Sequence, residues 1–200
     1  MLTENNGEIS QVRASAFGTL LHVVVLQQVE KLEDFKDRFR RFGCINLPKE
    51  KITEEWPSWY SRWVVAQTFT AMALEAFYFD YIQANASPTQ AKKKRTPPER
   101  FSYICNDLLG VDQVDTKSCL CKLEKLNMTR NHWVHNKSAT FEEYEKVKAF
   151  FSPDECISLI VNVLSIIADN DPDCILARET LIVLTQVQSN VDMALNELTT

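Results

Sequence analysis

The sequence predicts an all-α fold, on three observations. Apolar residues recur at three- and four-residue steps through most of the 200 residues, which is the spacing of one face of a helix. Only four glycines are present, too few for a sheet with many tight turns. No long segment alternates apolar and polar residues between turn signals. Since 45% of the residues are hydrophobic, we expect a helical bundle around one sizeable core.

Two long helices are predicted in the first half of the chain. Residues 11–42 form the first, because their apolar residues keep helical spacing up to Gly43, which ends the helix. The second is expected to begin near Trp56-Pro57 and to run to about Ala84. Its apolar residues cover more than one face, as is typical of a central helix.

A loop is predicted at residues 84–99, which contain three prolines and no apolar periodicity. Four consecutive basic residues stand in it: Lys92, Lys93, Lys94 and Arg95. Such a run is usually a solvated loop. The alternative is a loop that contacts phosphate groups of RNA.

Start and stop signals mark the remaining helices. A short helix is expected between Pro97 and Gly110, because proline favours the first turn and glycine the position after the last. Two capping boxes, a Ser or Thr followed three residues later by Glu, mark starts at Thr140 and Ser152. The later helices are expected over residues 117–136, 140–150 and 152–168, and from Asp171 to beyond Val187.

Several classes of protein are disfavoured by the composition. No GxGxxG or GxxxxGK motif is present, which excludes dinucleotide and Walker-type phosphate loops. The six cysteines contain no CxxC pair, and Cys119 and Cys121 would point to nearly opposite sides of a helix, so we expect reduced thiols and no zinc site. The amino terminus is polar and acidic, and no apolar run approaches the roughly 18 residues that span a bilayer. We therefore expect a cytoplasmic protein with no membrane association.

The net charge of −5 is unevenly distributed. Residues 149–200 hold one basic residue and eight acidic ones, so the acidity belongs to the tail. The rest of the chain is slightly basic and remains compatible with a nucleic-acid partner. We divide the chain into a helical domain at 1–150 and a helical pair at 151–200. That pair is expected to cover the bundle, mediate dimerisation or dock a partner.

Polar residues suited to RNA cleavage gather in the stretch TRNHWVHN, near the end of the helix predicted at 117–136. Asn131 and His135 are four residues apart and share a helix face, and the long side chain of Arg130 can reach the same region. Histidine exchanges a proton near neutral pH, and a guanidinium hydrogen-bonds two phosphate oxygens at once. These groups fit cleavage by the ribose 2′-hydroxyl without a metal. One histidine seldom acts as both acid and base, so we expect a symmetric dimer with a shared site.

The pattern Arg130-Asn131-x-x-x-His135, downstream of the segment MALEAFYFDYI, resembles the RNxxxH signature of the HEPN superfamily. The resemblance covers about residues 11–150 and implies a HEPN-like helical bundle with additional C-terminal helices. It also implies a metal-independent endoribonuclease that uses no cofactor, acts on RNA as a homodimer and employs Arg130, Asn131 and His135 in catalysis. Members occur in toxin–antitoxin pairs and phage-defence systems, so an antitoxin or defence-system protein is an expected partner.

Further residues receive roles by the same comparison. Glu75, and with less reason Asp80, is expected to orient Arg130 from the preceding core helix. Lys137 stands where some toxins of the superfamily carry a tyrosine that a nucleotidyltransferase modifies, which argues against regulation by that route. We expect Lys137 instead to contact RNA phosphate, together with the basic run at residues 92–95.

Other interpretations of these residues are open. Arg130 and His135 could cap helix carbonyls around a core Trp133. His132 and His135 could bind a metal, although no carboxylate or cysteine nearby completes the set. His22, among apolar neighbours, is expected to lie in the core. The alternative function is a catalytically inactive HEPN-like module for RNA or nucleotide binding or for protein assembly.

Overall fold

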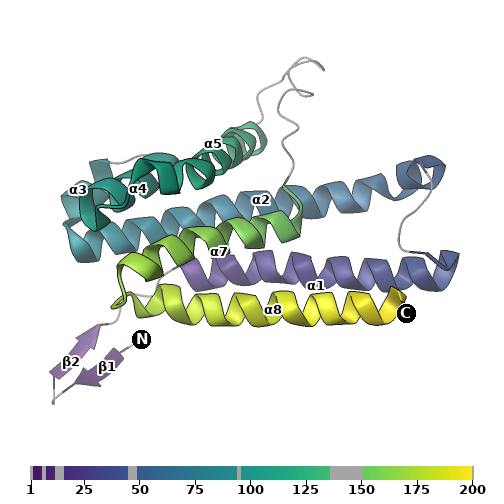
Figure 1. Cartoon of the computed structure of the whole chain (residues 1–200), viewed down its shortest axis with the longest axis horizontal. Helices are drawn as coiled ribbons and strands as arrows, with labels where there is room; N and C mark the ends of the chain where they lie inside the picture. Colours follow the sequence, from purple (N-terminus) through teal and green to yellow (C-terminus); the bar gives the residue numbers. More distant parts are fainter. Residues whose placement is uncertain are drawn as a thin grey trace.

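The computed structural model describes the backbone of residues 2–5, 8–11, 16–44, 49–93, 96–135 and 151–199, and the side chains within 16–44, 61–93, 96–132 and 151–197. The described helices are α1 (Phe17–Phe42), α2 (Lys49–Asn85), α3 (Pro88–Lys93), α4 (Pro97–Tyr103), the π-helix η1 (Ile104–Leu109), α5 (Gln113–His135), α7 (Pro153–Asn170) and α8 (Ile175–Thr199). Figure 1 shows α3, α4 and α5 on one side of α2, with α1 and α8 on the other. The protein is thus a helical bundle, as predicted.

A small hairpin precedes the bundle and was not predicted. Strands β1 (Leu2–Asn5) and β2 (Glu8–Gln11) pair antiparallel, and Figure 1 shows them away from the packed helices. The two residues between the strands in the sequence are Asn and Gly, the pair favoured in two-residue hairpin loops. Gln11 belongs to strand β2, and α1 begins at Phe17 instead of residue 11.

The first long helix ends where its sequence predicts. Gly43 adopts a left-handed conformation with φ of 69°, and its N–H donates to the carbonyl of Phe39 at 2.9 Å. His22 lies on the exposed side of α1, one position beyond the buried Leu21, so the expectation of a core histidine is wrong. Apolar neighbours in sequence did not reveal this, because a helix turns adjacent residues about 100° apart.

Helix α2 is the central element of the bundle. It begins at Lys49, earlier than the predicted Trp56-Pro57, and the proline lies within the helix. It contacts α1 and α7 as well as α3, α4 and α5. Its buried residues accordingly lie on more than one face: Ala66, Gln67, Thr70, Ala71, Ala73, Leu74, Phe77, Tyr78, Tyr81 and Ile82.

The connector after α2 is more helical than predicted. Helix α3 occupies part of the expected loop, and α4 starts at a capping box in which Thr96 Oγ1 accepts from the Glu99 N–H at 3.4 Å. The N–H of Thr96 in turn donates to Glu99 Oε2 at 3.1 Å. Gly110, with φ of 67°, follows the last turn of η1, as predicted.

The C-terminal helices complete the core. Helix α7 starts at the predicted capping box, where the N–H of Ser152 donates to Glu155 Oε2 at 2.8 Å. Asp154 accepts hydrogen bonds from Gln28 and Lys31, which connects the start of α7 to α1. Eight residues of α7 are buried, and the helix contacts α1, α2 and α5. Helix α8 packs on α1 and α7.

The helix predicted from Thr140 to Phe150 falls outside the described residues. Among the helices that are described, none is both long and apolar enough to cross a lipid bilayer.

Candidate functional site

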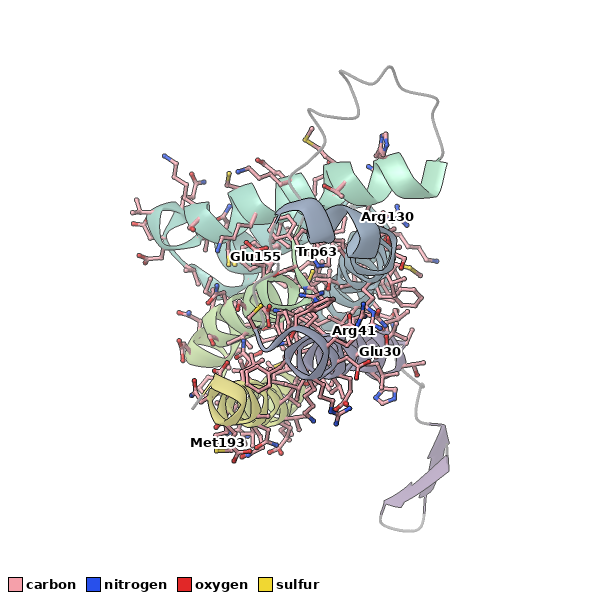
Figure 2. All side chains as sticks on the ribbon, turned by 90° about the vertical axis from the view of Figure 1, so that its right-hand side faces the viewer. Glu30, Arg41, Trp63, Arg130, Glu155 and Met193 are labelled. Carbon is pink, nitrogen blue, oxygen red and sulfur yellow. The ribbon has the colours of Figure 1, made fainter. Side chains whose placement is uncertain are left out.

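A cleft of about 470 Å³ opens where α2, α4 and α5 meet, and Arg130 lines it. Its charged residues are Glu75 and Asp80 from α2, Arg100 from α4 and Arg130 from α5. The apolar part of the lining is formed by Ala16, Leu20, Met72, Ala76 and Phe79. Figure 2 shows Arg130 on the side of α5 that faces α2. We call this cleft, defined by those nine residues, the arginine cleft.

Arg130 has hydrogen-bonding capacity to spare within the described part of the chain. Its Nη1 donates to Oδ1 of the adjacent Asn131 at 3.2 Å, which fixes the amide and the guanidinium relative to each other. Its Nε is buried and has no hydrogen-bond partner there. An unsatisfied buried donor costs about 1–3 kcal/mol, which a hydrogen bond to an acceptor at that atom would offset. Arg130 thus lines the cleft and keeps one donor without a partner in the described part of the chain.

Arg100 is a second guanidinium in the arginine cleft, and the sequence did not single it out. Its side chain is only 9% exposed, and its Nη1 donates to the Glu75 backbone carbonyl at 3.2 Å and to Glu75 Oε1 at 3.4 Å. The guanidinium also lies over the ring of Phe79, 5.4 Å from its centre. The available signal was the position of Arg100 on the apolar face of its helix, three residues after the buried Pro97 and four before the buried Ile104.

Glu75 lines the same cleft as Arg130, but its hydrogen bonds in the described structure are with Arg100. Orientation of Arg130 by Glu75 stays a prediction. Asp80 lines the arginine cleft and also a neighbouring cleft of about 440 Å³, which contains Tyr81 and Asp171. In that second cleft the Tyr81 hydroxyl donates to Asp171 Oδ2 at 2.6 Å.

The predicted histidine lies at the end of α5. His135 is the last residue of that helix, one turn beyond Asn131, and its side chain falls outside the described residues. The structure therefore brings Arg130, Asn131 and Glu75 to one region and supplies the backbone position of His135.

The predicted RNA-contacting residues are placed only in part. Lys92 and Lys93 are exposed in the last turn of α3, and neither lines the arginine cleft. Lys94, Arg95 and Lys137 lie outside the described residues.

The cysteines follow the helical pattern expected of them. Cys119 is buried and Cys121 is exposed, so the two point to different sides of α5 as predicted. Burial raises the pKa of Cys105 and of Cys156 to about 12, which keeps both thiols protonated near neutral pH. Among the side chains that are described, no three His, Cys, Asp or Glu residues are grouped so that they could hold a metal ion.

The arginine cleft contains hydrogen-bond donors for an anion and groups that can accept a proton. The Arg130 guanidinium can hydrogen-bond an oxyanion, the Arg100 guanidinium is already paired with Glu75, and the two carboxylates can accept a proton. Comparison with known proteins does not assign the chain to a family. No family model, no curated protein and no solved structure matches it.

Proposed function

We propose that the protein is a metal-independent endoribonuclease of HEPN type that cleaves RNA by attack of the ribose 2′-hydroxyl. The observation that supports it best is Arg130, whose buried Nε lacks a partner in the described structure and which lines a cleft with a second arginine. A cleft of about 470 Å³ lies in the size range of small-ligand sites and can accept a phosphodiester with its flanking sugars.

In this proposal Arg130 binds the non-bridging oxygens of the scissile phosphate, where negative charge grows in the transition state. Asn131 holds the guanidinium through the 3.2 Å hydrogen bond of its Oδ1. His135 transfers a proton to or from a ribose oxygen. The 2′-oxygen bonds to phosphorus as the bond to the 5′-oxygen breaks, which leaves a 2′,3′-cyclic phosphate and a 5′-hydroxyl. Two proton-transfer groups are needed, one at each oxygen.

The partners follow from the same resemblance and are proposals too. RNA is the substrate, and Lys92, Lys93, Lys94, Arg95 and Lys137 contact its backbone outside the cleft. A homodimer would bring a second RNxxxH cluster to the site. An antitoxin or another defence-system protein would hold the nuclease inactive.

A second function is supported by the charge balance of the cleft. Glu75 and Asp80 match the two arginines, so the arginine cleft is neutral, and a phosphate must compete with Glu75 for Arg100. A neutral cleft gives little stabilisation to the negative charge that grows in a cleavage transition state, which favours a module that binds RNA or a nucleotide without cleaving it.

The two functions are separated by cleavage of a labelled RNA in the presence of a chelator. We expect the native chain to cleave, and Arg130→Ala and His135→Ala each to lower the rate by about 10²–10⁴-fold, as removal of a proton-transfer or charge-stabilising group does. His22→Ala is the matched control, since this histidine is exposed on α1 and does not line the cleft. Equal rates for all four proteins would leave the binding module as the function.

A further inference from the structure

We propose that α8 docks a helix of another protein, one that is amphipathic and carries Lys or Arg residues beside its apolar face. The docking surface joins two features of the outer side of α8. One is an exposed apolar stripe along the helix, and the other is an acidic cleft at its start. The inference stands on these observations and does not depend on the proposed ribonuclease function.

The apolar stripe consists of five exposed residues of α8, and we call it the α8 stripe: Ile175, Leu176, Ile182, Val183 and Met193. Ile175 and Ile182 are 62% and 64% exposed. They are seven positions apart and Met193 is eleven further on, so the three lie within about 20° of one line along the helix. Leu176 and Val183 widen the stripe to about 100°, the width of the face that a helix usually buries.

Helix α8 also has a second apolar face, which packs within the bundle. Ala177, Leu184 and Val191 are buried, and α8 contacts α1 and α7. These three residues are seven positions apart and lie on the side of the helix opposite the α8 stripe. Figure 1 shows α8 at the edge of the bundle, and Figure 2 shows Met193 on its outer side. Packing among the described helices therefore accounts for one apolar face only, and a continuous exposed face of this kind marks an interaction surface.

The cleft of about 440 Å³ beside the start of α8 is acidic. Its lining joins two residues of the α8 stripe to three carboxylates: Ile175, Leu176, Asp80, Asp171 and Asp173. None of the described residues that line it is basic. Asp171 accepts from the Tyr81 hydroxyl at 2.6 Å and from the N–H of Asp173 at 3.2 Å, and neither donor brings a positive charge. A Lys or Arg side chain is therefore the complementary group for this cleft.

Charge selects the occupant of the surface. Residues 149–200 hold eight acidic residues and one basic residue, and the exposed Glu179 stands between Ile175 and Ile182 on the same face of α8. Two copies of α8 would bring like charges together, and RNA or an anionic lipid surface would be repelled as well. A cationic amphipathic helix fits both features, since its apolar side covers the stripe while a Lys or Arg enters the acidic cleft.

The test is binding of two synthetic helical peptides to the full chain, followed by fluorescence anisotropy. Both span about three heptads with Leu at the a and d positions, and one carries Lys where the other carries Glu at e and g. We expect the Lys peptide to bind at least about tenfold more tightly than the Glu peptide. Ile182→Asp should weaken its binding at least about tenfold, although this variant adds an attractive charge. Val114→Asp is the matched control with less than about a threefold effect, since Val114 is 78% exposed on α5.

The acidic part of the surface is tested by removing charge. Asp173→Asn combined with Glu179→Gln should weaken binding of the Lys peptide about tenfold at low salt, and most of that difference should vanish at about 1 M salt. Asp115→Asn combined with Glu124→Gln removes the same charge at exposed positions of α5. This control should change the affinity less than about threefold, because its charges lie away from the docking surface.

Two binding results would overturn the proposal: a native chain that binds neither peptide, or an Ile182→Asp variant that binds the Lys peptide as tightly as the native chain. Sedimentation of the chain alone tests the other occupant. If the native chain forms a dimer that Ile182→Asp abolishes and Val114→Asp preserves, the α8 stripe is instead an interface between two copies. We expect Ile182→Asp to keep the native oligomeric state, which leaves the α8 stripe available to the partner helix.

Discussion

Ile160→Ala is expected to destabilise the whole protein, because α7 is part of the central core. Ile160 is fully buried, and the substitution removes three carbon atoms from its side chain. At about 0.8 kcal/mol per buried methylene, the lost transfer free energy is about 2.4 kcal/mol. The cavity left behind adds to this, so we expect a loss of about 3–4 kcal/mol in the free energy of unfolding. For a chain of this size, that loss lowers the melting temperature by roughly 6–16 °C.

Ile182→Ala is the matched control, since it removes the same atoms at a position of α8 that is 64% exposed. It should change the free energy of unfolding by no more than about 0.5 kcal/mol. Urea and thermal unfolding followed by circular dichroism measure both variants. A loss for Ile160→Ala no larger than that of its control would refute the packing described for α7. An unfolding curve in which the C-terminal helices melt in a separate first transition would refute it as well.

Two further predictions concern a helix cap and the buried thiols. Ser152→Ala removes half of the capping box that starts α7 and should cost about 1 kcal/mol, whereas Ser152→Asp, which can still cap, should cost less in the same urea titration. Burial raises the pKa of Cys105 and Cys156 from 9.0 to about 12, so between these pH values the folded chain holds more protons than the unfolded chain. Stability should therefore fall as pH rises through this window, and Cys105→Ala should show a shallower fall; identical slopes would contradict the assigned burial.

Local signals in the sequence predicted most helix ends correctly. Gly43, Gly110 and Ser152 act through hydrogen bonds to residues within six positions, so their effect is visible in a short stretch. The exceptions have local causes as well. Strands β1 and β2 flank an Asn-Gly pair in the sequence, which is a hairpin signal that helical periodicity does not include. Pro57 lies inside α2, where proline was read as a helix start.

The candidate site was predictable only as far as one helix extends. Arg130, Asn131 and His135 follow from spacing on α5, whereas the pairing of Glu75 with Arg100 joins residues 25 positions apart. That contact depends on how α4 packs against α2, which helical periodicity does not specify. A basic residue on the buried face of a short helix indicates a carboxylate partner, but not which carboxylate.

The chemical ends of the RNA product test the ribonuclease proposal most directly. We expect the native chain, incubated with RNA and excess chelator, to leave a 2′,3′-cyclic phosphate on one fragment and a 5′-hydroxyl on the other. Arg130→Ala under the same conditions should leave the RNA uncut. Fragments with a 5′-phosphate, or cleavage that stops when the chelator is added, would contradict attack by the 2′-hydroxyl in the arginine cleft.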